Sequence, residues 1–260
     1  MKVLFRTCGG LGNQIFQYFF LFCILEKYKS TQVVHYHSVN YDRIAEHEFP
    51  YDNHLSVPSL FDVFLIKLRL LPLFRALGFK NLFFLKFGDI LIVDGYYQSK
   101  ESYFIFSKIQ LHNSFSKIRE VIFNDFTKQK VRSSLFHLRI GDFFNSISEE
   151  RSFIIMSLKH LDSGTFVISN NDELIINDLE IQEILSLGGL IYIKTFGFTA
   201  LQLLELFCGF ERIKSSGSSL SFAAAIFSDV DINMNIMLSG NPLVYFNNLL
   251  GLKKHLLCSL

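Results

Sequence analysis

Three of the four residues at positions 9–12 are glycines, and two amide side chains, Asn13 and Gln14, follow them directly. Glycines between a strand and a helix let the backbone approach a ligand closely, and the N-terminus of the following helix presents amide groups to an anion. Gly10 and Gly12 match the first two glycines of the dinucleotide-binding pattern, but the third is missing. The segment therefore predicts either a phosphate-binding loop, with amides suited to hydroxyl-rich ligands, or a tight turn.

A second polar segment, residues 137–142, follows an apolar stretch that is typical of a strand. His137 and Arg139 are two positions apart and share one face if the strand continues through them. The guanidinium of Arg139 is a permanent, forked cation that suits a diphosphate, and Asp142 could orient it. His137, Arg139 and Asp142 are therefore candidate catalytic residues. The alternative is an arginine–aspartate ion pair at a strand end.

Two further segments combine residue types that bind phosphates or sugars. Ser218 and Ser219 lie in a serine-rich turn before an alanine-rich helix, where hydroxyl groups and helix amides can cradle an oxyanion. Tyr97 and Gln98 lie in residues 95–99, after an apolar strand, and an aromatic ring beside an amide suits the face and the hydroxyls of a sugar. Alternatively, the serine-rich turn is an ordinary helix N-cap, and residues 95–99 form a loop packed by two tyrosines.

The elements that must position these segments alternate between strand and helix. Short apolar runs predict strands at residues 3–5, 32–35, 90–93, 134–138, 165–169, 190–194 and 212–214. Longer segments predict helices at residues 14–27, 61–87, 102–129 (with polar breaks near residues 112–114), 172–187, 199–208 and 219–227. This alternation implies parallel sheets with helices on both faces, whose ligands bind at the carboxyl ends of the strands. We place a domain boundary near residues 128–133.

The composition limits the class of protein. Half of the 260 residues are hydrophobic, which is enough for one large core or two modest ones, and the net charge of +1 gives no electrostatic case for a nucleic-acid partner. The four cysteines form no CxxC pair and no zinc-ligand spacing, which favours reduced thiols in a cytosolic protein. The N-terminus lacks the apolar segment of a signal peptide, and no apolar stretch is long enough to span a bilayer.

Residues 61–86 carry basic side chains among leucine, isoleucine and phenylalanine: Lys67, Arg69, Arg75, Lys80 and Lys86. Such a segment could form a basic amphipathic surface that lies on an anionic membrane. The alternative is a pair of helices packed on their own domain, which is favoured because Pro72 interrupts the helix and the charges do not share one face. We therefore predict a cytoplasmic protein, with peripheral contact at the inner face of the plasma membrane as a second hypothesis.

Taken in order, these segments resemble the motifs of the α-1,2-fucosyltransferases, glycosyltransferase family 11. The opening Gly-Gly-Leu-Gly-Asn-Gln with Ile-Phe-Gln-Tyr after it, the Gly-Tyr-Tyr-Gln-Ser segment and the His-x-Arg-x-Gly-Asp segment match motifs of that family. A Ser-Asn-Asn-Asp turn and the serine motif before the alanine-rich helix resemble two more. The five segments cover most of the chain, at residues 9–18, 95–99, 137–142, 169–172 and 217–225.

The resemblance implies an α/β fold of the GT-B type with two Rossmann-like domains, residues 1–130 on the acceptor side and residues 131–260 binding the donor nucleotide. It implies transfer of L-fucose from GDP-fucose, with inversion and without a metal or other cofactor, to the 2-hydroxyl of a galactose-type acceptor. That acceptor would be an oligosaccharide or lipid-linked glycan, as in O-antigen or other surface-polysaccharide synthesis. Tyr97 and Gln98 would face the acceptor. Carried over by position, the donor site would comprise Gly10, Gly12, Asn13, Gln14, His137, Arg139, Asp172, Ser218 and Ser219.

Two alternatives stay open. Asp229 and Asp231 form an Asp-x-Asp pair, the metal–diphosphate grip of another glycosyltransferase class that would take a UDP-sugar, although a solvated turn is the favoured interpretation of a pair this close to the C-terminus. The chain also departs from the family motifs, because Ile140 replaces an arginine and Phe222 with Ala223 replaces two tryptophans. These departures motivate the second alternative, a non-catalytic relative that binds a sugar nucleotide.

Overall fold

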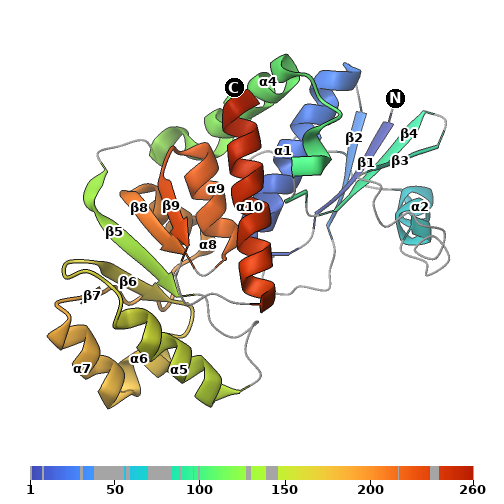
Figure 1. The fold of residues 1–260 in the computed structure, drawn as a ribbon. Coiled ribbons are helices and arrows are strands. Elements are labelled where there is room, and N and C mark those ends of the chain that lie inside the picture. Colours follow the sequence, from blue (N-terminus) through green and yellow to red (C-terminus); the bar gives the residue numbers. More distant parts are fainter. Residues whose placement is uncertain are drawn as a thin grey trace. The chain divides into compact units, whose positions relative to one another are not determined.

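The computed structural model describes residues 2–7, 9–29, 32–37, 56, 59–69, 84–87, 89–95, 97–98, 100–126, 130–138, 146–215, 217–234 and 240–259. The chain divides into two compact units, residues 1–122 with 258–260 and residues 123–257. Each unit has its own sheet of mainly parallel strands with helices packed on it (Figure 1). The predicted α/β fold with two Rossmann-like units is confirmed.

The first unit is built on a four-stranded sheet with the order β2-β1-β4-β3. Strand β1 pairs in parallel with both β2 and β4, and β3 pairs antiparallel with β4. The residues of β3 were predicted to be helical. They form a strand because this short apolar run finds a partner in β4, which periodicity alone cannot foresee. The bounds are β1 Lys2–Thr7, α1 Leu11–Tyr28, β2 Gln32–His37, α2 Leu60–Arg69, β3 Phe84–Phe87, β4 Ile90–Asp94 and α4 Lys108–Ile118.

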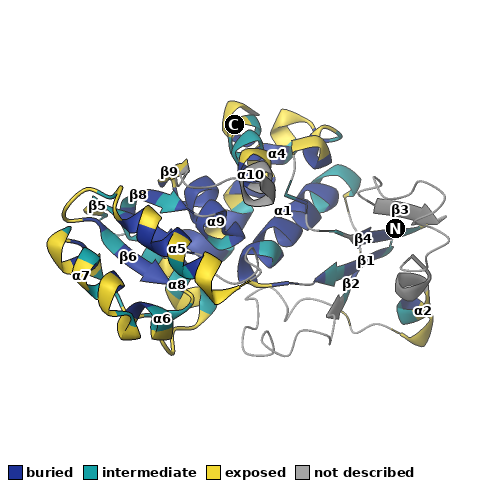
Figure 2. Cartoon of the chain, turned by 60° about the horizontal axis from the view of Figure 1, so that its bottom comes forward, coloured by how far each residue is buried: buried dark blue, intermediate teal, exposed yellow. Residues whose placement is uncertain are grey.

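Helix α1 forms the centre of the first unit. It is apolar on several faces and is buried over most of its length, in keeping with a helix enclosed by its own domain (Figure 2). Helix α4 packs against it and runs unbroken through residues 112–114, where a break was predicted. Ser114 does not interrupt the helix because its hydroxyl donates to the carbonyl of Gln110, one turn earlier, at 2.7 Å, while Ser107 and Gln110 cap the start of α4 reciprocally.

The start of α2 is tied to β1 by a buried carboxylate. The Nζ atom of Lys2 lies 2.6 Å from Oδ1 of Asp62, whose side chain is 2% exposed. Burial alone would raise the pKa of Asp62, but hydrogen bonds from Lys2 and Ser59 outweigh burial and lower it. The carboxylate therefore stays charged and holds the helix end against the sheet.

The second unit has five parallel strands in the order β7-β6-β5-β8-β9, the 3-2-1-4-5 arrangement of a doubly wound sheet. Right-handed crossovers place α5 to α7 on one face and α8 and α9 on the other, and the packing of α5 on α7 and of α8 on α9 agrees with this. The bounds are β5 Val131–Leu138, α5 Ile147–Leu158, β6 Phe166–Ser169, α6 Asp172–Asn177, α7 Leu179–Leu187, β7 Ile191–Tyr192, α8 Ala200–Cys208, β8 Phe210–Ser215, α9 Ser219–Phe227, β9 Asp231–Met234 and α10 Gly240–Ser259.

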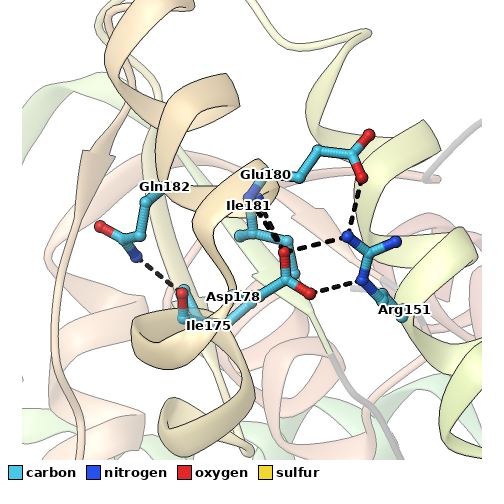
Figure 3. A network of polar contacts seen from close by, with 6 residues as sticks. All are labelled: Arg151, Ile175, Asp178, Glu180, Ile181 and Gln182. Atoms are coloured by element: carbon cyan, nitrogen blue, oxygen red, sulfur yellow. Dashed lines mark hydrogen bonds and ion pairs between the residues drawn. The ribbon is translucent and has the colours of Figure 1, made fainter.

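The helix predicted at residues 172–187 is two helices, and Asp178 is the reason for the break. Asp178 leaves the helical conformation and caps α7, its Oδ1 atom accepting from the N–H groups of Glu180 and Ile181 at 3.1 and 3.2 Å. Arg151 of α5 donates two hydrogen bonds to the same carboxylate and one to Glu180 (Figure 3). This cluster locks α5 onto α7.

Helix α5, strand β9 and helix α10 were not predicted from the sequence.

Within the described ranges, none of the helices has both the length and the apolar character needed to cross a membrane.

Candidate functional site

Each sheet has one place where the strand order changes direction. In the second unit the chain runs outward from β5 through β6 to β7 and then returns to the other side of β5 as β8. In the first unit the chain goes from β1 to β2 on one side and later returns to the other side of β1 as β4. Crossovers on opposite faces leave a crevice at the carboxyl ends of the two central strands, where open α/β sheets bind ligands. We therefore expect one crevice between β1 and β4 and another between β5 and β8.

The glycine-rich loop after β1 is shaped by its contact with Asn13. Gly9 has a φ of +79°, and a Cβ atom on it would lie 2.3 Å from Nδ2 of Asn13. Gly10 is the N-cap of α1, and its carbonyl accepts from the N–H groups of Asn13 and Gln14 at 2.9 and 3.1 Å. Gly12 is buried in the first turn of the helix. The Gln14 side chain is also buried and donates to the carbonyl of Gly9 at 3.1 Å, so it braces the loop instead of lying at its lip as predicted.

Gln98 joins Asn13 to the end of the neighbouring strand. Its Nε2 atom donates to Oδ1 of Asn13 at 2.6 Å, and both residues are partly exposed. Amide side chains donate and accept hydrogen bonds, which is the chemistry that sugar hydroxyl groups require. Two residues taken from separate motifs, 85 positions apart, are thus brought together beyond the carboxyl ends of the paired strands β1 and β4.

Tyr97, which was predicted to contact the acceptor, is turned into the first unit. It is 4% exposed, and its ring stacks on Phe20 of α1 with the centroids 3.8 Å apart. Its φ of +51° belongs to the left-handed region, and its carbonyl accepts a hydrogen bond from the Tyr103 hydroxyl at 2.9 Å. The unusual backbone angle points the ring inward and leaves Gln98 at the crevice, so the structure gives Tyr97 a packing role.

The predicted catalytic residues lie at the end of β5. His137 is the penultimate residue of that strand, in register with Ser215 of β8. Its ring packs against Phe207 of α8, with the centroids 4.9 Å apart, and the residue is 9% exposed. His137 therefore lies at the carboxyl end of β5, beside Ser215 of β8, and is largely covered by α8. Arg139 and Asp142 lie outside the described residues.

The turn after β8 is organised by a buried serine. The Oγ atom of Ser215 accepts from the N–H groups of Gly217 and Ser218 at 3.1 and 3.3 Å and lies 2.8 Å from Oγ of Ser221. The Ser221 hydroxyl in turn donates to the carbonyl of Ser218 at 2.8 Å. Gly217 adopts a φ of +93°, which turns the chain sharply back into the helix. Four residues of the serine motif therefore form one hydrogen-bonded unit.

This turn places the N-terminus of α9 at the carboxyl end of β8. Ser218 is the N-cap, and its Oγ atom accepts from the N–H group of Leu220 at 3.2 Å. Ser218 and Ser219 are 5% and 7% exposed. The positive end of a helix beside two hydroxyl groups favours an anion. The predicted donor-binding serines thus lie at the expected edge, with Ser218 also performing the structural role of a cap.

Asp172 has a structural role that the sequence did not reveal. Its carboxylate accepts from the Tyr192 hydroxyl and from the Thr195 N–H group, the latter at 3.0 Å. Burial and the hydrogen bond to Asp172 raise the pKa of Tyr192 far above its ordinary value, so the phenol stays a donor. Asp172 therefore joins the start of α6 to the end of β7 and the turn after it. The sequence had indicated a donor-binding role for this residue.

A buried carboxylate that the sequence analysis missed lies beside the end of β6. Glu150, in the first turn of α5, is 8% exposed. Burial raises its pKa, and a hydrogen bond from the side chain of Asn171 opposes that effect. An acidic residue in the first turn of a helix usually lies in solvent, so nothing in the sequence marks this one as buried.

The Asp-x-Asp pair lies at the wrong edge of the sheet for a donor grip. Asp231 is the first residue of β9, so the pair precedes the strand, whereas ligands bind where strands end. Asp229 has a φ of +57°, and its carbonyl accepts from Nζ of Lys130 at 2.7 Å. Lys253 donates to the next carbonyl at 3.0 Å. The pair is part of a turn held by two lysines.

Across the described parts of the chain, no three His, Cys, Asp or Glu side chains are grouped so that they could hold a metal ion.

No protein-family model matches the chain, and a search of the curated proteins gives no match. Solved structures do show similarity. One is the glycosyl transferase family 9 protein from Veillonella parvula DSM 2008, with 9% identity, a TM-score of 0.43 and coverage of 90% of this chain and 79% of that one. Another is E. coli heptosyltransferase WaaC with ADP-2-deoxy-2-fluoro heptose, with 9% identity, a TM-score of 0.41 and coverage of 90% and 88%.

Proposed function

We propose that this chain is a glycosyltransferase that moves L-fucose from GDP-fucose to the 2-hydroxyl of a galactose-type acceptor. One observation carries the proposal: residues from separate motifs meet at the carboxyl ends of both sheets, Asn13 with Gln98 in the first unit and His137 with Ser215 of the serine turn in the second. Transfer between a sugar nucleotide and a glycan needs two such sites. The order of the motifs, which resembles that of the α-1,2-fucosyltransferases, supports fucose as the donor sugar.

The second unit would bind the donor diphosphate. As the bond between the anomeric carbon and the phosphate oxygen breaks, negative charge grows on the leaving diphosphate, and fixed positive groups there lower the barrier. The braced N-terminus of α9 at Ser218 and Ser219 supplies partial positive charge without reorganising, because Ser215 already holds the turn. Arg139 would supply the full charge, with a fork that matches two phosphate oxygens.

The first unit would bind the acceptor. The Gln98 amide would bind hydroxyl groups of the acceptor, and Asn13, which is bonded to it, would bind the donor sugar as the resemblance implies. Attack of the 2-hydroxyl on the anomeric carbon, from the side opposite the diphosphate, inverts the configuration. Fixing the reactants in this way supplies much of the acceleration. The hydroxyl proton must pass to a base as the new bond forms, for which Asp142 and His137 are the candidates from the sequence.

We propose that no metal takes part, because Arg139 and the helix end would neutralise the diphosphate. We also propose that the acceptor is a free or lipid-linked glycan. The protein would be cytoplasmic, with peripheral contact to the membrane. Both proposals rest on the resemblance and on the composition.

The proposal is tested by thermal melting of the purified protein with GDP, GDP-fucose, UDP and UDP-galactose, each in the presence of a chelator. A ligand that binds only the folded state raises the melting temperature. GDP and GDP-fucose should stabilise, and Arg139→Ala should remove the shift. Arg132→Ala is the matched control, because Arg132 is exposed near the opposite end of the same strand. Stabilisation by UDP compounds alone would overturn the fucose donor.

A further inference from the structure

Two phenylalanines are exposed on the short turn that follows β7. Phe196 is 83% exposed and Phe198 is 42% exposed. Single exposed apolar side chains are ordinary on protein surfaces. Two phenyl rings on one turn, placed at the ligand edge of a parallel sheet, call for a more specific explanation.

The turn that carries the two rings is braced at both ends. The N–H group of Phe198 donates to the carbonyl of Thr195 at 2.9 Å, and Gly197 has a φ of +84° that only glycine adopts easily. The Thr195 hydroxyl donates to the carbonyl of Ser169 at 3.0 Å. Thr199 forms a reciprocal capping box at the start of α8. The backbone that carries the two rings is therefore fixed, which lowers the entropy cost of binding a ligand on this turn.

The turn lies at the same edge of the sheet as the serine turn. Strands β7, β6, β5 and β8 are consecutive neighbours, and parallel strands lie about 4.8 Å apart, so the end of β7 is about 10 Å from the end of β5. A nucleotide whose phosphates lie at the β5–β8 crevice can extend along this edge towards β7. On the way it passes the exposed amide of Asn170, which follows β6.

We infer that Phe196 and Phe198 form the platform on which the nucleobase of the donor stacks. The inference rests on the proposed function, since it takes the nucleotide to be bound by the second unit. A phenyl ring offers a π-face to any base, and the side chain of Asn170 can bond to polar atoms of the base or ribose. Asp172 contributes by holding Thr195, and thereby the turn, in place.

The absence of tryptophan from the sequence allows a direct test. The Phe196→Trp variant keeps an aromatic platform and introduces a single indole whose fluorescence reports a stacked base. Leu187→Trp is the matched control, because Leu187 is 81% exposed in the same unit but ends α7, at the opposite edge of the sheet. GDP should quench the indole of Phe196→Trp at saturation and leave that of Leu187→Trp unchanged. Inorganic pyrophosphate should quench neither.

Calorimetric titration of the double variant Phe196→Ser/Phe198→Ser gives a second readout. Its affinity for GDP should fall by about 5- to 150-fold, the usual effect of removing a stacking side chain, while its affinity for pyrophosphate stays unchanged. If GDP binds the wild type and both variants equally and does not quench Phe196→Trp, the platform is refuted and the proposed function stands. If neither GDP, UDP nor ADP binds the wild type, both proposals fail.

Discussion

The Ser215→Ala substitution tests whether the Ser215 hydroxyl holds the serine turn in place. The Ser215 hydroxyl is fully buried and accepts from two backbone N–H groups while bonding to Ser221. Leaving a buried donor without its acceptor costs about 1–3 kcal/mol. The two N–H bonds are 3.1 and 3.3 Å long, so the lower part of that range applies to each. The expected loss is about 2–3 kcal/mol in the free energy of unfolding.

Thermal melting followed by circular dichroism measures this effect. A loss of that size should lower the melting temperature by about 4–12 °C for a chain of this length, and it should weaken GDP binding because the turn loses its brace. Ser228→Ala is the control. The Ser228 hydroxyl donates to the carbonyl of Ala224, which also accepts from the Ser228 N–H group, so its removal leaves that carbonyl bonded. If Ser215→Ala melts no lower than Ser228→Ala, the turn is not held as described.

Three further predictions concern stability, and melting curves check each of them. Asp178→Ala removes the N-cap of α7 and the carboxylate that Arg151 grips, and it should cost about 1 kcal/mol, whereas the half-exposed Glu180→Ala should cost little. Glu150→Gln should raise the melting temperature at about pH 8 and not at about pH 4, because a carboxylate with a raised pKa destabilises the fold only once it has ionised. Asp62→Asn should lower the melting temperature at neutral pH. That difference should vanish as the pH falls through the lowered pKa of Asp62, below about pH 4, where the wild type loses the same charge.

Much of the fold follows from the sequence, because alternating apolar runs and helix caps are local signals. Helix α9 begins and ends where residues 219–227 predict it. The meeting of Asn13 and Gln98 also follows, since both come after strands that are expected in one parallel sheet. The failures have tertiary causes. Tyr97 turns inward because Phe20 offers its ring a stacking partner, and α6 ends because Asp178 finds a partner on a different helix.

The site was only partly predictable for the same reason. Residue type and motif indicated Asp172 as a ligand-binding group, but its two hydrogen-bonding partners come from β7 and the turn after it, which the sequence does not place beside it. The burial of Glu150 likewise depends on how α5 packs. The exposure of Phe196 cannot be read from its apolar character, which by itself predicts burial.

The proposed reaction transfers fucose with the help of Arg139 and without a metal ion. The most direct measurement is GDP release from GDP-fucose in the presence of chelator, with a panel of galactose-terminated oligosaccharides as acceptors. We expect release that depends on a galactoside, is abolished by Arg139→Ala and is retained by Arg132→Ala. Absence of acceptor-dependent release from a folded protein that binds GDP would contradict this proposal.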